Sequence, residues 1–432
     1  MTPWKARALG AGLLAGACVG VLDFGPMLNA APAFADSSDP VVPSDYTALV
    51  LGHALLSQPD AAYMKEVIDT YVDPTNAFAG QPTYNVVGAP VSVYTPETDY
   101  MSGLTQGVAD LDNAITAQLT ANPADPDPNI VVAGYSMSNS VVTQEMINLA
   151  KAGSPDTEGL KFVLAEDLNN PDGGIFTRFP GMFGVNLPAT PADTPYDTSI
   201  YTIEYSGASD FPQYYGNMYA DLNAADGYLN LHPYLLPGWP AYFDPSSVTQ
   251  AVAEPTSAGY TGSTDYFLIP TQDLPLLDGM HAIGGTSAFS DLIQPDMRVL
   301  VDLGYNWTGG ADVSTLATLS SNPDIDFTAV NDYLTAGADQ GMIAYLVDLN
   351  VLPQSDLAGI ADMYPYAPDL LGLMGGALSN ESLAATDATS SAGLLASDLA
   401  GSTNPLAVDF GSSYISMAAD LASFYQSLAS FL

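Results

Sequence analysis

Residues 129–151 read NIVVAGYSMSNSVVTQEMINLAK. The apolar run up to Tyr135 predicts a buried strand, and residues 139–151 predict a helix. The segment GYSMS at residues 134–138 joins the two, in the strand–Gly-x-Ser-x-small–helix pattern of a nucleophile elbow. Such a turn is so tight that the side chains two places before and after the serine must be small. The pattern predicts that Ser136 holds its hydroxyl in the open, facing the N-terminal amides of a helix.

Apolar strand patterns alternate with helical patterns on both sides of this turn. Further strands are expected at residues 46–52, 84–94, 160–165, 199–205 and 265–269, and amphipathic helices at residues 63–71 and 104–119. This alternation indicates βαβ units. We therefore predict an α/β fold with a mostly parallel central sheet flanked by helices.

The composition changes twice later in the chain. Residues 211–260 are rich in Tyr, Pro and Trp, which is typical of an elaborated, lid-like insertion. After about residue 310 the chain becomes rich in Ala, Ser and Leu, and residues 414–431 carry an apolar stripe at helical spacing. We expect a main domain over residues 36–310 and a helical C-terminal extension over residues 311–432.

The N-terminus has the composition of an export signal. Lys5 and Arg7 precede an uncharged apolar run at residues 8–22, and Ala33-Phe34-Ala35 supplies a small-x-small cleavage site. We expect residues 1–35 to be a signal peptide and the protein to be secreted or held in the cell envelope. Lipidation at Cys18 is disfavoured, because Ala15 stands where such sites usually have a larger aliphatic residue.

Charge and residue counts exclude several classes of function. The 432 residues include 7 Lys+Arg, 48 Asp+Glu and 1 Cys, with a formal net charge of −41. That charge excludes unassisted nucleic-acid binding, and one Cys excludes a disulfide framework. The acidic turn DLNNPDGG at residues 167–174 lacks calcium-loop spacing, and no Gly-rich phosphate loop with its Lys is present. We expect neither a cofactor nor a metal.

An activated serine needs a base, and the chain has three histidines. In this type of fold the order along the chain is Ser, acid, His, so His53 is disfavoured as the base. Its position after the first strand suits a loop whose backbone N–H joins that of Met137 in binding an oxyanion. His232 and His281 both follow the serine, and spacing alone leaves the choice between them open.

Two carboxylates are candidates for the acid. Asp210 comes just beyond the strand expected at residues 199–205 and precedes His232 by one connection. Asp167 follows the strand expected at residues 160–165 and is the alternative.

Residues 205–234 (YSGASDFPQYYGNMYADLNAADGYLNLHPY) resemble the signature of the PE-PPE domain, a serine-hydrolase module of mycobacteria and their relatives. The similar positions are Asp210, Phe211, Pro212, Asn223, Ala224, Gly227, His232 and Tyr234. The resemblance extends over roughly residues 46–305. It implies an α/β-hydrolase fold related to cutinases, and it places a catalytic triad on Ser136, Asp210 and His232.

Two departures from the family pattern affect these expectations. The N-terminus shows no Pro-Glu or Pro-Pro-Glu module, so we expect export by the general route. The stretch Leu51-Gly52-His53-Ala54 replaces the Gly-rich stretch that is usual after the first strand.

Taken with the export signal and the aromatic segment, the serine turn and the resemblance predict an exported serine carboxylester hydrolase that acts on apolar acyl esters through an acyl-enzyme. The alternatives are an acyltransferase that moves acyl chains onto cell-envelope glycolipids, and a catalytically silent envelope interaction protein. We expect an acyl ester or lipid substrate, contact with envelope lipids and no nucleic-acid partner.

Overall fold

The central sheet is the framework of the described part of the chain. A computed structural model describes residues 45–96, 100–121, 128–153, 158–181, 186–236, 243–271, 273–277, 287–306, 309–323 and 325–353. The strands follow the order β2-β1-β4-β5-β6-β8-β7, and β3 also pairs with β1. Every strand pair is parallel except β7 with β8. The predicted α/β fold with a mostly parallel central sheet is confirmed.

The strands are short, as is usual in parallel sheets. They are β1 (Asp45–Leu51), β2 (Asn85–Val86), β3 (Val91–Val93), β4 (Ile130–Tyr135), β5 (Leu160–Ala165), β6 (Thr198–Ile203), β7 (Val252–Ala253) and β8 (Thr264–Ile269). The described helices are α1 (Ala61–Val67), a π-helix (Ile68–Val72), α2 (Tyr100–Ala121), α3 (Ser138–Lys151), α4 (Ile175–Arg178), α5 (Met218–Asn230), a 3₁₀-helix (Pro245–Gln250), α7 (Ser287–Asp302) and α8 (Phe327–Asp348).

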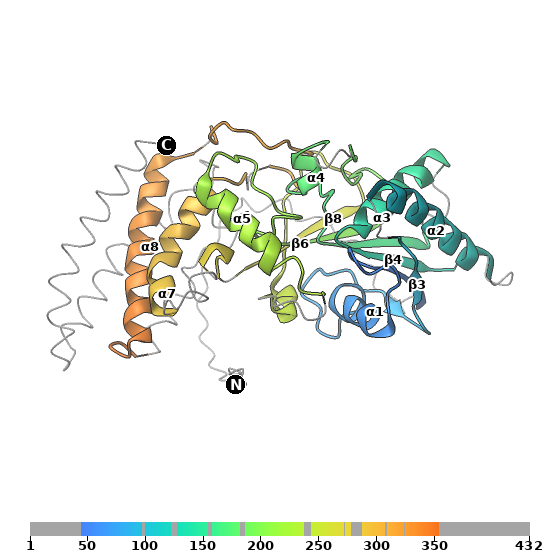
Figure 1. Cartoon of the computed structure of the whole chain (residues 1–432), viewed down its shortest axis with the longest axis horizontal. Coiled ribbons are helices and arrows are strands. Elements are labelled where there is room, and N and C mark those ends of the chain that lie inside the picture. Colours follow the sequence, from blue (N-terminus) through green and yellow to red (C-terminus); the bar gives the residue numbers. More distant parts are fainter. Residues whose placement is uncertain are drawn as a thin grey trace, which may run out of the picture. The chain divides into compact units, whose positions relative to one another are not determined.

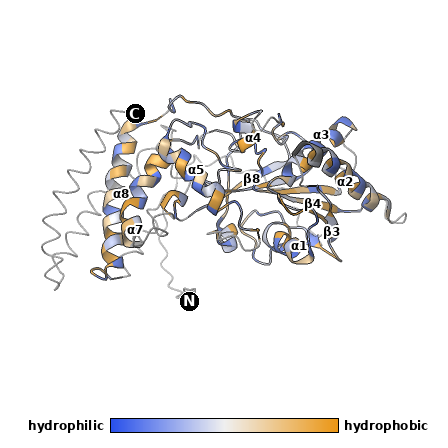
Figure 2. Cartoon of the chain, in the orientation of Figure 1, coloured by the Kyte–Doolittle hydropathy of each residue, from blue (hydrophilic) through white to orange (hydrophobic). Residues whose placement is uncertain are grey.

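Both faces of the sheet are covered, so its central strands are almost continuously apolar (Figure 2). Alternate residues of β4 point to opposite faces. Val131 and Ala133 pack with α1 and the π-helix in one core, whereas Ile130 and Val132 pack with α2 and α3 in the other. This two-sided packing fixes the strand ends, where the candidate site residues lie.

The predicted elements differ from the structure mainly outside the sheet's centre. The strand expected at residues 84–94 is interrupted and forms β2 and β3, which pair with the two ends of β1. The aromatic segment at residues 211–260 contains α5, the 3₁₀-helix and β7.

The helices α7 and α8 pack side by side beyond the sheet (Figure 1). Gly341 on α8 permits this approach, because a Cβ there would stand 2.0 Å from the Leu292 carbonyl oxygen on α7. The predicted boundary at residue 310 falls between these two helices and stays a prediction. Residues 1–35 and 414–431 lie outside the described residues. None of the described helices combines the length and the apolar character needed to cross a bilayer.

Candidate active site

The serine turn has the strained geometry that its sequence predicts. Ser136 lies between β4 and α3 with a φ of 59°, in the left-handed region that non-glycine residues rarely adopt. A Cβ at Gly134 would come within 2.2 Å of Asn139 Oδ1 and 3.2 Å of Val142 Cγ2. The glycine is therefore required by the close approach of α3 to the end of β4.

Ser138 does more than supply a small side chain at the other end of the turn. Its hydroxyl accepts a hydrogen bond from the Tyr135 N–H and lies within 3.1 Å of the Tyr135 carbonyl oxygen, to which it can donate. The side chain is buried. Ser138 thus fastens the first residue of α3 to the last residue of β4.

We expect Ser138→Ala to be folded and active but less stable. Removing the hydroxyl takes a partner from the buried Tyr135 N–H, so the free energy of unfolding should fall by about 1–2 kcal/mol. Urea denaturation followed by circular dichroism measures the change. An unchanged midpoint would mean that position 138 needs only smallness.

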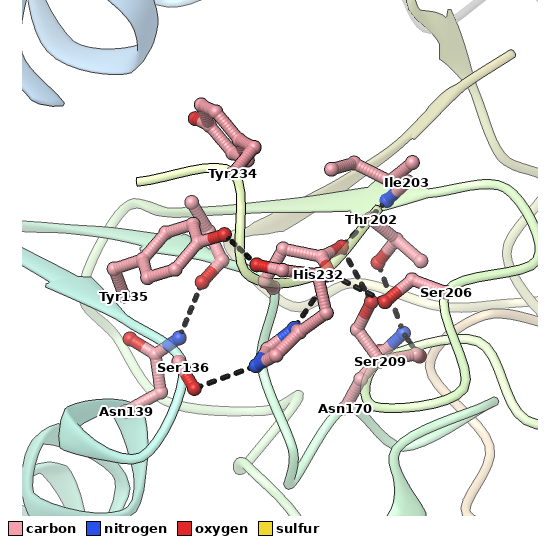
Figure 3. A network of polar contacts seen from close by, with 12 residues as sticks. Tyr135, Ser136, Asn139, Asn170, Thr202, Ile203, Ser206, Ser209, His232 and Tyr234 are labelled. Carbon is pink, nitrogen blue, oxygen red and sulfur yellow. Dashed lines mark hydrogen bonds and ion pairs between the residues drawn. The ribbon is translucent and has the colours of Figure 1, made fainter. Parts of the chain in front are cut away.

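His232 lies against the serine. Its Nε2 is 2.7 Å from Ser136 Oγ (Figure 3). The residue follows the C-terminal end of α5, where its N–H donates to the Gly227 carbonyl. The rings of Tyr135 and Tyr228 lie nearly parallel to the imidazole, at interplanar angles of 18° and 11°. Tyr135 Oη also donates to the His232 carbonyl, which fixes the backbone behind the ring.

The carboxylate on the far side of the imidazole belongs to Glu166, not to Asp210. Glu166 Oε2 lies 2.8 Å from His232 Nδ1. Glu166 follows β5 directly, with a φ of 55°, and its side chain is fully buried. Because β5 is the neighbour of β4 in the sheet, the first residue after β5 lies beside the serine turn.

The structure therefore places Glu166, and not the Asp210 expected from the sequence, against His232 Nδ1. The Asp210 carboxylate instead accepts a hydrogen bond of 2.7 Å from the Tyr205 N–H. Burial raises the pKa of Asp210 well above its usual range. A buried carboxyl that favours its neutral form is a poor partner for an imidazolium.

Asp167, the alternative acid, also has a different partner. Its carboxylate accepts from the Thr190 hydroxyl at 2.6 Å and from the Asn169 N–H at 2.9 Å. Burial raises its pKa to about 6. The rest of the acidic turn is likewise engaged by protein groups, since Asp172 forms an ion pair of 2.7 Å with Arg178. The described residues contain no group of three or more His, Cys, Asp or Glu placed to hold a metal ion.

The predicted oxyanion donors lie next to the serine turn. Met137 immediately precedes α3, where backbone N–H groups have no intrahelical partner. Val50 of β1 pairs opposite Ala133 of β4, so the loop that contains His53 leaves the sheet beside Ser136. An oxyanion role for either residue stays a prediction.

The His53 side chain is not arranged as an oxyanion donor. Its Nδ1 contacts the Ala54 carbonyl, to which it must donate, so Nε2 carries the lone pair in the neutral ring. That Nε2 is buried and has no hydrogen-bond partner among the described residues. Burial lowers the pKa of His53 and so favours the neutral ring. Any oxyanion contact from this loop would come from backbone N–H groups. His281 lies outside the described residues.

The strand–serine–helix elbow and the parallel sheet define the α/β-hydrolase class. The family model of the PE-PPE domain matches residues 81–306, and the chain belongs to this family.

Relatives in Mycobacterium tuberculosis agree with this membership. PE family protein PE3 is 42% identical over 65% of this chain and 60% of its own length. Esterase PE16 is 38% identical over 63% of this chain and 51% of its own length. SL1278 acyltransferase Chp1 is 30% identical over 45% of this chain and 48% of its own length. The chain thus spans between about half and 60% of the length of these relatives.

Proposed function

We propose that the chain is a serine carboxylester hydrolase that acts on apolar acyl esters through an acyl-enzyme. The observation that supports this most directly is the continuous chain of contacts from Ser136 Oγ through the His232 imidazole to Glu166. Similarity to esterase PE16 supports the same reaction class. The proposed acid is Glu166 in place of Asp210.

In the proposed reaction Ser136 attacks the ester carbonyl while His232 Nε2 takes the hydroxyl proton. Glu166 holds the Nδ1–H tautomer and stabilises the imidazolium that forms. The Met137 N–H, at the N-terminus of α3, stabilises the oxyanion. His232 then returns the proton to the leaving alcohol. In the second half of the reaction a water molecule, deprotonated by His232, attacks the acyl-enzyme, and the carboxylic acid product and free Ser136 are released.

Apolar surface next to the base supports an apolar acyl group. Tyr228, whose ring stacks on the His232 imidazole, is 48% exposed. Large exposed apolar side chains beside a reaction centre offer contact area to an acyl chain. We therefore expect octanoyl esters to be better substrates than acetyl esters.

Two measurements test this function. A fluorophosphonate probe should label the full chain at Ser136 and leave Ser136→Ala unlabelled, with Ser138→Ala as the serine control that is still labelled. The kcat/KM values for p-nitrophenyl octanoate and p-nitrophenyl palmitate should be higher than the value for p-nitrophenyl acetate. Absence of labelling would favour the catalytically silent alternative, and a preference for acetate would contradict the apolar acyl site.

An acyltransferase is the second candidate, because SL1278 acyltransferase Chp1 is among the relatives. In that reaction a sugar or lipid hydroxyl replaces water in the second half. Adding glycerol or a disaccharide to the ester assay and analysing the products by mass spectrometry separates the two. Acylated acceptor formed in excess over free acid would favour the transferase.

We also propose that residues 1–35 direct export, with cleavage after Ala35 and residence outside the cytoplasm or in the envelope. N-terminal sequencing of the protein from culture medium and envelope fractions tests this. A mature form that begins at Asp36 would support it, whereas uncleaved protein in the cytoplasm would contradict it.

A further inference from the structure

The turn at residues 205–210, which follows β6, contacts Glu166 at more than one point. Glu166 Oε1 accepts from the Ser209 hydroxyl at 2.6 Å, and Oε2 accepts from the Ser206 hydroxyl. Both serines are fully buried. With the Ile203 N–H at 2.8 Å and His232 Nδ1, the carboxylate has four partners. Two of these four are hydroxyls of a single turn.

The turn itself is held closed by the Asp210 carboxylate. Asp210 accepts from the N–H of Tyr205, whose φ of 65° is in the left-handed region. The Asp210 N–H donates to the Ser206 carbonyl at 2.7 Å. From the opposite side, Asn170 Nδ2 donates to the Ser209 carbonyl at 3.3 Å. These bonds fix the backbone from which both hydroxyls project.

The same turn packs tightly on α5, the helix that leads to His232. A Cβ at Gly207 would stand 2.1 Å from the Ala224 carbonyl oxygen, and one at Gly227 would stand 2.0 Å from the Tyr205 carbonyl oxygen. The two backbones are thus nearly in contact at two points. The turn therefore contacts Glu166 through two serine hydroxyls. Through its backbone it also contacts α5, the helix that leads to His232.

We propose that the turn at residues 205–210 is the positioning element of the acid–base pair, with Ser206 and Ser209 as positioning residues that orient the Glu166 carboxylate toward His232. This rests on the proposed function. A carboxylate can rotate about its last side-chain bond, and one of its oxygens reaches Nδ1 only when the carboxylate plane is turned toward the imidazole. The two hydroxyls, one to each oxygen, hold that orientation without contacting the substrate. In this arrangement Asp210 acts on the site only indirectly, by accepting from the Tyr205 N–H of the turn.

The test compares Ser209→Ala with Ser209→Thr, which keeps a hydroxyl, and with Ser290→Ala. Ser290 is a buried serine on α7 whose hydroxyl has no partner among the described residues. With p-nitrophenyl octanoate and the full chain, we expect Ser209→Ala to lower kcat about tenfold with little change in KM. Ser209→Thr should recover most of the loss, and Ser290→Ala should match the unmodified protein.

A double-mutant cycle separates positioning from a purely structural role. In a Glu166→Gln background the Ser209 hydroxyl no longer orients a carboxylate, so Ser209→Ala should add almost no further loss in the rate of Ser136 phosphonylation. An equal loss in both backgrounds, or no loss in the unmodified protein, would overturn the proposal. If Ser136→Ala and Glu166→Gln both retain turnover, the proposed function fails instead.

Discussion

Ser136→Ala is expected to lower kcat/KM for p-nitrophenyl octanoate by at least about 10³-fold. In the proposed reaction Ser136, His232 and Glu166 act as a unit, and the first step needs the serine hydroxyl. The change removes one oxygen atom, and alanine keeps the side chain small. The strain at position 136, where φ is 59°, remains in the variant. Stability should therefore change little, and urea denaturation checks that the variant is folded.

His232→Ala should show a loss of similar size, since an unactivated serine is a weak nucleophile. His281→Ala is the matched control and should retain most of the activity. If His281→Ala were inactive and His232→Ala active, the contact of 2.7 Å between Ser136 and His232 would not be the catalytic one.

The serine turn could be predicted from sequence because its determinants are local. A buried strand, Gly134 and a following helix lie within one continuous stretch, and the tight contacts at Gly134 arise within it. His232 could be favoured on chain order and on family resemblance. The contact with Ser136 depends on where α5 ends, which the sequence pattern did not reveal.

The helix α5 lacks the signal that identified the helices expected at residues 63–71, 104–119 and 139–151. Its buried positions are Ala220, Asn223, Ala224 and Gly227, which recur at helical spacing but are small or polar. They are small because α5 packs almost directly on the backbone of the turn after β6. A search for large apolar residues at that spacing does not find such a helix, so the aromatic residues around it suggested a lid.

Chain order does not distinguish Glu166 from Asp210 as the carboxylate that contacts His232. Both lie between the serine and His232 in sequence. The structure separates them by sheet order, since β5 is the immediate neighbour of β4 and β6 is one strand further away. Glu166 directly follows the strand expected at residues 160–165, so adjacency of successive strands was the signal that could have identified it.

Glu166→Gln is therefore expected to reduce kcat by about 10³–10⁴-fold, whereas Asp210→Asn should leave kcat within a few-fold. The side-chain amide introduced by Glu166→Gln either presents its N–H₂ to His232, which now finds an acceptor there, or turns its oxygen to His232 and Ser206 and its N–H₂ to the Ile203 N–H and the Ser209 hydroxyl. The first outcome favours the wrong imidazole tautomer. The second sets two N–H donors against each other and disturbs the orientation of the side chain. The Asp210→Asn variant, in contrast, keeps an oxygen that can accept the Tyr205 N–H, and it replaces a carboxyl whose burial already favours the neutral form.

Fluorophosphonate labelling rates provide the second readout for this pair, because phosphonylation of Ser136 needs the base but no ester substrate. In Glu166→Gln the labelling rate should fall as kcat falls. In Asp210→Asn it should stay close to the rate of the unmodified protein. Asp210→Ala removes the acceptor for the Tyr205 N–H and should lower stability more than Asp210→Asn does. The opposite ranking, with Asp210→Asn inactive and Glu166→Gln active, would restore Asp210 as the acid. It would also require His232 to turn away from the carboxylate that it contacts at 2.8 Å.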